Sequence, residues 1–123
     1  MRFINTTTFR IKSFDPDRHP YAILSHRWGD NEATFQEYQE YEKGNRAESD
    51  LGGFNTKIRG LCRQAKQDGL DWAWIDTCCV DKTSSSELSE SINSMYAWYL
   101  KSTVCYVYLE DVERAACICA VTE

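Results

Sequence analysis

The amino-acid sequence predicts a single α/β domain of three layers, in which helices cover both faces of a mainly parallel sheet. Three short apolar runs predict buried strands, and segments with helical spacing separate them. This alternation of strands and helices is typical of a parallel sheet with helices on its faces. The three apolar runs are 21–25, 72–75 and 103–109. We expect them to be adjacent parallel strands with the first run in the middle.

The composition is that of an ordinary soluble globular domain. A chain of 123 residues suits one domain, and 42% of the residues are hydrophobic. The net charge is −5 and the fourteen basic residues form no cluster, which argues against a nucleic-acid-binding face. No run approaches the ~20 apolar residues of a membrane span. We therefore expect no nucleic-acid partner and no membrane span.

The first residues add a strand to this core. Thr8–Phe14 alternates apolar and polar residues, which predicts a half-buried strand that we place at an edge of the sheet. The turn residues Asp15-Pro16-Asp17 follow it. Because no apolar signal segment precedes it, we expect a cytoplasmic protein.

Three segments have the spacing of amphipathic helices: 33–43, 55–69 and 86–99. Gly69 is placed to end the second. In the third, Leu88, Ile92, Met95 and Tyr99 repeat at helical intervals, so we expect this side to face the sheet. The expected core includes six residues: Leu24, Trp74, Ile75, Ile92, Met95 and Val104.

The six cysteines predict no disulfide framework. Several lie inside apolar runs, where a reduced cysteine acts as a small hydrophobic residue. A cytoplasmic protein keeps such thiols reduced. Cys117-x-Cys119 has no second cysteine pair at zinc-finger spacing, so we expect no metal site.

Polar and aromatic residues follow the predicted strands where each strand ends. Open α/β sheets bind ligands at this carboxyl edge. The candidate residues are Ser25, Arg27, Trp28, Gly29, Asp76, Cys79, Asp81 and Glu87. We expect them to meet at one edge and to form a substrate site.

Three segments together resemble the HET (heterokaryon incompatibility) domain of filamentous fungi. They read YAILSHRWGD at 21–30, GLDWAWIDTCCVDK at 69–82 and SELSESINSMYAWY at 86–99. The resemblance covers about residues 1–112 and its motifs are long and unusual. It implies a domain that triggers cell death after non-self recognition, as part of fungal innate immunity.

HET domains are regarded as distant relatives of TIR domains, so the resemblance also implies a TIR-like, flavodoxin-like fold. Some TIR domains hydrolyse NAD with a helix glutamate, and Glu87 matches that position here. A fixed carboxylate can stabilise the oxocarbenium-like charge that develops on the ribose. The implied activity is that of a NAD glycohydrolase switched on by assembly, with NAD as substrate and no cofactor.

Each candidate residue also has a purely structural interpretation. Ser84-x-x-Glu87 is a capping box, in which the glutamate binds the backbone at the start of its helix. Arg27 can bind a phosphate, whereas Trp28 can stack on a base or cover the core. Asp76 can bind a ribose hydroxyl or accept amide hydrogen bonds from its own loop. Cys79 can act as a nucleophile or simply pack. These alternatives stay open at this point.

The last residues, about 113–123, depart from the family pattern. HET domains usually continue into a segment with a Trp-Thr-Leu-Gln-Glu-like motif, which this sequence does not contain. We treat 1–123 as one HET-like domain with an atypical tail. The alternative function is a non-catalytic death-signalling module, which acts by self-association or by binding a partner such as an upstream receptor, or an inactive short copy.

Overall fold

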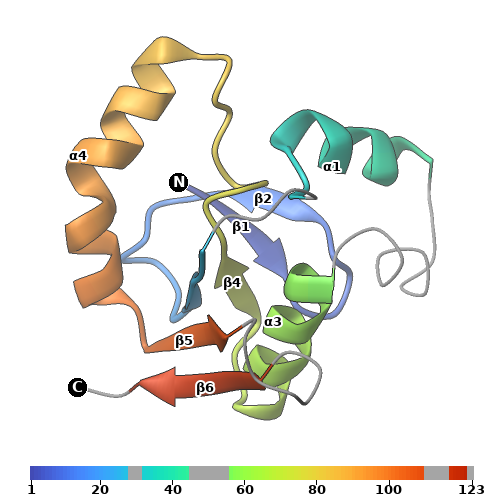
Figure 1. Ribbon diagram of the computed structural model, residues 1–123, viewed down its shortest axis with the longest axis vertical. Helices are drawn as coiled ribbons and strands as arrows, with labels where there is room; N and C mark the ends of the chain where they lie inside the picture. Colours follow the sequence, from blue (N-terminus) through green and yellow to red (C-terminus); the bar gives the residue numbers. More distant parts are fainter. Residues whose placement is uncertain (28–31, 45–55, 110–116, 122–123) are drawn as a thin grey trace.

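Six strands form one open sheet, and the computed structural model describes residues 1–27, 32–44, 56–109 and 117–121 (Figure 1). The strands are β1 (Arg2–Asn5), β2 (Ile11–Ser13), β3 (Ala22–Ser25), β4 (Trp72–Trp74), β5 (Val104–Leu109) and β6 (Cys117–Val121). Their order across the sheet is β2-β1-β4-β3-β5-β6. The predicted α/β class is therefore confirmed.

The three predicted buried strands are adjacent and parallel. Ala22 in β3 pairs with Ala73 in β4 on one side and with Val104 in β5 on the other. The Ala22, Ile23 and Leu24 side chains of β3 are fully buried, as a central strand with helices near both faces requires. The central position predicted for 21–25 is thus confirmed.

The outer strands make the sheet mixed, so the expectation of a mainly parallel sheet is wrong. Only β3–β4 and β3–β5 are parallel, whereas the three other pairings are antiparallel. A parallel pair needs a crossover of a dozen residues or more. The connections from β1 to β2 and from β5 to β6 are shorter, because only 6–10 and 110–116 lie between the strands. Both pairs are antiparallel for this reason.

The N-terminal segment forms a hairpin where the sequence predicted one strand. β2 occupies a sheet edge as expected, but it is shorter than the predicted 8–14, and β1 was not predicted. The side-chain oxygen of Asn5 accepts hydrogen bonds from the amides of Thr7 and Thr8 at 2.9 and 3.0 Å. Phe9 has a positive φ of 60°. This local turn chemistry interrupts the alternation and folds the segment back on itself.

The three predicted helices are confirmed as α1 (Phe35–Lys43), α3 (Thr56–Gln67) and α4 (Ser85–Lys101). Figure 1 shows α4 on one side of the sheet and α3 on the other. Thr34 and Glu37 form a capping box at α1, and Gly69 ends the turn after α3 with φ of 80°. None of these helices is long and apolar enough to span a membrane.

The orientation of α4 differs from the prediction. Ile92 is 65% exposed, whereas Ser91 and Trp98 face the interior. The Trp98 ring packs edge-on against Trp74 at 5.6 Å between centroids. Burying this large ring contributes more than burying Ile92, and it rotates the helix by about one residue. Met95 is only partly buried, but the other four expected core residues are buried.

Candidate functional site

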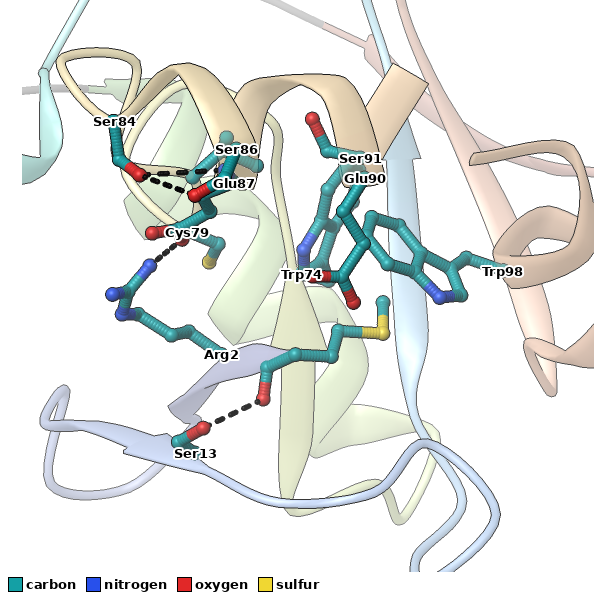
Figure 2. A pocket seen from close by; sticks show the side chains of 12 residues that line it. Arg2, Ser13, Trp74, Cys79, Ser84, Ser86, Glu87, Glu90, Ser91 and Trp98 are labelled. Atoms are coloured by element: carbon teal, nitrogen blue, oxygen red, sulfur yellow. Dashed lines mark hydrogen bonds and ion pairs between the residues drawn. The ribbon is translucent and has the colours of Figure 1, made fainter. Parts of the chain in front are cut away.

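A cleft of about 320 Å³ lies between α4, β4 with the loop that follows it, and the N-terminal hairpin (Figure 2). Its lining residues come from distant parts of the chain: Met1, Arg2, Ser13, Trp74, Cys79, Val80, Ser84, Ser86, Glu87, Glu90, Ser91 and Trp98. The volume falls within the range of small-molecule sites in proteins. Of the eight predicted site residues, Glu87 and Cys79 line this cleft.

The carboxylate of Glu87 does not complete the predicted capping box. The Ser84 hydroxyl accepts a hydrogen bond from the Glu87 amide at 3.3 Å, which is the helix-capping half of the motif. The reciprocal bond is absent here, because the Ser84 amide donates to the Asp81 carbonyl at 3.3 Å. Glu87 Oε1 instead accepts from the Asp81 amide at 3.2 Å. Ser84 therefore caps α4 by accepting from the Glu87 amide, while the Glu87 carboxylate remains at the cleft.

Arg2 is the charged partner of Glu87. The two side chains form an ion pair and are 26% and 28% exposed. The Arg2 guanidinium also lies over the Phe35 ring, 4.2 Å from its centroid. Arg2 was not among the predicted site residues, because β1 was not predicted and no local spacing links Arg2 to α4.

Two tryptophans form the aromatic wall of the cleft. Trp74 is fully buried, and its Nε1 has no hydrogen-bond partner within the described part of the chain. Buried donors are rarely left without a partner, so this indole can donate to an acceptor on a bound ligand. Nearby, the Ser91 hydroxyl donates to the Leu88 carbonyl at 2.8 Å, which leaves its oxygen as an acceptor.

A second polar cluster lies at the ends of β3 and β4. His26 Nε2 is 2.7 Å from Asp76 Oδ1, and Lys57 Nζ is 3.1 Å from His26 Nδ1. Lys57 Nζ also donates to Glu32 Oε2 at 2.5 Å. An ammonium group can only donate, so Nδ1 accepts and Nε2–H donates to Asp76. The His26 and Glu32 side chains are 1% and 5% exposed, so this cluster ties the strand ends to α3.

Asp76 therefore belongs to this cluster and does not line the Glu87 cleft. Its charge also acts on Tyr99, whose pKa burial raises to about 12, with Asp76 adding to the rise and a hydrogen bond from Ser25 opposing it. The Arg27 carbonyl accepts from Lys57 at 2.9 Å while its side chain is exposed. The predicted candidates are thus divided between two places: Cys79 and Glu87 line the cleft, whereas Asp76 and the Arg27 backbone contact the His26–Lys57 cluster. Trp28 and Gly29 lie outside the described residues.

Asp81 and the two neighbouring cysteines have structural contacts. The Asp81 carboxylate accepts hydrogen bonds from Thr83 and Gln36, which hold its pKa below the usual value. Burial raises the pKa of the Cys78 thiol well above the usual range, which is unsuited to a nucleophile. Cys79 is 2% exposed at the cleft. In the described ranges, no three metal-ligating side chains are grouped to hold an ion.

The family described as Heterokaryon incompatibility protein (HET) matches residues 21–122, and the chain belongs to this family. It is similar to the Vegetative incompatibility protein HET-E-1 of Podospora anserina, with 53% identity over 93 residues. That match covers 76% of this chain and 7% of the relative, so the chain spans a small part of the relative's length.

No solved structure matches the chain. The family match and the relative confirm the HET resemblance. The expected likeness to TIR and flavodoxin folds stays a prediction. The substrate-binding roles of Ser25, Arg27, Asp76, Cys79 and Asp81 are also still predictions.

Proposed function

We propose that this HET domain triggers cell death in fungal heterokaryon incompatibility by hydrolysing NAD at the Glu87 cleft. The similarity to a protein named for vegetative incompatibility supports the biological role. The observation that carries the chemical role is the position of the Glu87 carboxylate, which faces a cleft instead of capping its own helix. NAD hydrolysis is inferred from the likeness to TIR domains, and we propose the two together.

The proposed reaction breaks the bond between ribose C1′ and the nicotinamide nitrogen. Nicotinamide leaves with the bonding electrons, water adds to C1′, and a proton passes to solvent. Glu87 would stabilise the positive charge on the ribose as the bond breaks. Glu87 lies in the first turn of α4, where the partial positive charge of a helix N-terminus attracts a carboxylate.

The aromatic wall supports recognition of the nicotinamide ring. Trp98 can offer a ring face to a planar cation, and Trp74 Nε1–H can donate to the carboxamide oxygen. The ion pair with Arg2 offsets part of the Glu87 charge. The proposal therefore requires this pair to loosen when substrate enters.

The test is nicotinamide release by concentrated purified protein incubated with NAD. Glu87→Gln keeps the side-chain shape and removes the charge, so the rate should fall ~100-fold or more in a folded protein. Glu40→Gln on the exposed side of α1 is the matched control and should keep the wild-type rate. A folded Glu87→Gln variant with full turnover or full toxicity in an expressing cell would eliminate the mechanism.

A second candidate function is a non-catalytic module that signals by self-association. The observation that favours it is the exposed apolar side of α4, where Ile92, Tyr96 and Leu100 are 65%, 76% and 50% exposed. Toxicity that survives in Glu87→Gln but depends on these three residues would select this function.

A further inference from the structure

Two cavities adjoin at Arg2. One is the cleft of about 320 Å³ described above, and the other, of about 220 Å³, lies between the N-terminal hairpin and α1. Arg2 and Ser13 line both of them. These two residues are direct partners in the β1–β2 register, so their side chains lie on the same face of the hairpin. They therefore form the boundary between the two cavities.

Arg2 contacts a functional group in each cavity. Its guanidinium pairs with Glu87 in the cleft, and it lies 4.2 Å from the centre of the Phe35 ring, which lines the second cavity. The Arg2 and Glu87 side chains are 26% and 28% exposed, so water weakens the ion pair and Arg2 can exchange it for another anion. An anion that draws the guanidinium away frees the Glu87 carboxylate and one face of the Phe35 ring together.

We propose that Arg2 binds the diphosphate of a dinucleotide that spans both cavities, with the adenosine on Phe35 and Gln39 of α1. This inference rests on the proposed function, which puts the nicotinamide riboside half of NAD beside Glu87. The cleft is at the lower end of the ~300–1,000 Å³ range of small-molecule sites, so it suits one half of a dinucleotide better than the whole. The second cavity supplies room for the other half.

The distribution of charge over the two cavities favours this placement. The cleft contains the carboxylates of Glu87 and Glu90, and the second cavity contains that of Glu42. Arg2 lies between them. A dinucleotide carries its negative charge in the central diphosphate and has sugar hydroxyls on either side. Carboxylates accept hydrogen bonds from sugar hydroxyls and repel phosphate, so the diphosphate is favoured at the boundary.

The first turn of α4 adds hydrogen-bond donors near Arg2, because the ion pair with Glu87 places the guanidinium there (Figure 2). The Ser84 and Ser86 hydroxyl oxygens are 3.2 Å apart. One hydroxyl hydrogen joins them, which leaves the other for a ligand. A helix N-terminus also binds phosphate through its backbone amides, and a guanidinium binds phosphate oxygens in pairs. The boundary is therefore suited to a phosphate group.

Phe35 and Gln39 are suited to an adenine base. They are four residues apart in α1 and both line the second cavity. A base can stack on the Phe35 ring, while the Gln39 amide donates to and accepts from the adenine edge at the same time. A nicotinamide mononucleotide or riboside has no adenosine and makes neither contact.

Isothermal titration calorimetry with ADP tests this subsite without any cleavage, because ADP contains the adenosine and the diphosphate but no nicotinamide. Binding should saturate, and Arg2→Met and Phe35→Leu should each raise the dissociation constant ~10-fold or more. Arg63→Met removes an exposed arginine from α3 and is the matched control, which should bind ADP like the wild type. Circular dichroism confirms that each variant is folded.

Cleavage of three substrates separates the two contacts. NAD and nicotinamide mononucleotide both carry the phosphate that draws Arg2 from Glu87, so both should have a kcat well above that of nicotinamide riboside. NAD alone reaches Phe35, so its KM should be ~10-fold or more below that of the mononucleotide. Phe35→Leu should raise the KM for NAD toward that of the mononucleotide and leave both kcat values unchanged. A merely structural role of Phe35 would lower kcat for every substrate.

ADP that does not bind, or that binds Arg2→Met as tightly as the wild type, would overturn the inference, as would equal KM values for NAD and the mononucleotide. NAD cleavage with equal KM values would still leave the Glu87 mechanism standing. ADP binding that depends on Arg2 and Phe35, in a protein that releases no nicotinamide, would support the subsite and remove the proposed reaction.

Discussion

Arg2 and Glu87 join β1 to the first turn of α4 through an ion pair at the cleft (Figure 2). The pair is about three-quarters buried, and the Arg2 guanidinium also lies over Phe35. A charge pair with a defined aromatic contact restricts both side chains. The N-terminal hairpin and the candidate catalytic residue are therefore coupled.

This coupling predicts a measurable interaction energy. Arg2→Met and Glu87→Gln should each lower the free energy of unfolding by about 1 kcal/mol. The double variant should lose less than the sum, with a coupling of about 0.5–1 kcal/mol from urea unfolding of all four proteins. Arg2→Met with Glu90→Gln is the control cycle, because Glu90 lines the cleft without an ion-pair partner in the described residues. Equal coupling in both cycles would contradict the pair.

A second prediction separates the two sides of α4. Trp98→Ala should lower the free energy of unfolding by about 3–5 kcal/mol, because it empties the space against Trp74. Ile92→Ala should change it by less than about 1 kcal/mol, since the side chain is 65% exposed. Urea titration measures both. If Trp98→Ala does not fold, Trp98→Phe should still be more destabilising than Ile92→Ala, and the reverse order would place Ile92 in the core.

These elements show which parts of the fold the sequence predicts. Residues 21–24 and 72–75 are apolar throughout, so their strand character and burial follow from the local pattern. The local pattern does not determine which side of α4 faces the sheet, because Ile92 and Trp98 both fit a helical apolar repeat. The choice depends on Trp74, which lies in another strand.

The candidate site was predictable to a similar extent. Position in the chain placed Glu87 near a sheet edge, and Cys79 is beside it at the cleft. Asp76 lies away from that cleft because it binds His26, which in turn contacts Lys57. These residues are far apart in the sequence and come together only in the folded chain. Local spacing contains no signal for such long-range pairs.

The buried cluster predicts the cost of removing Lys57. Its ammonium group binds Glu32, and the two side chains are 7% and 5% exposed. Lys57→Met should lower the free energy of unfolding by about 3–5 kcal/mol, because it deprives a buried carboxylate of its cation. Adding Glu32→Gln should recover part of the loss. Thermal unfolding of the single and double variants measures this, and equal losses in both would contradict the pairing.

The last prediction concerns alkaline pH and begins with Tyr21. Its hydroxyl donates to the Trp98 carbonyl at 2.6 Å. Burial raises the pKa of Tyr21 from 10.0 to about 12, and the charge of Asp17 adds to the rise. Burial also raises the pKa of Tyr99 to about 12. Between about pH 10 and 12 the folded chain therefore holds protons that the unfolded chain has lost.

Because the folded state binds more protons in this range, the free energy of unfolding must fall as pH rises through it. Below about pH 10 the contribution is complete, so stability should be level there with respect to these groups. Tyr21→Phe should lower stability at pH 8 by about 1 kcal/mol through the lost hydrogen bond. It should also reduce the slope between pH 10 and 12, because one titrating group is removed. Urea unfolding at intervals from pH 8 to 12 measures both effects, with Tyr96→Phe as a control because that ring is 76% exposed. An unchanged slope in Tyr21→Phe would show that the Tyr21 proton is not retained on folding.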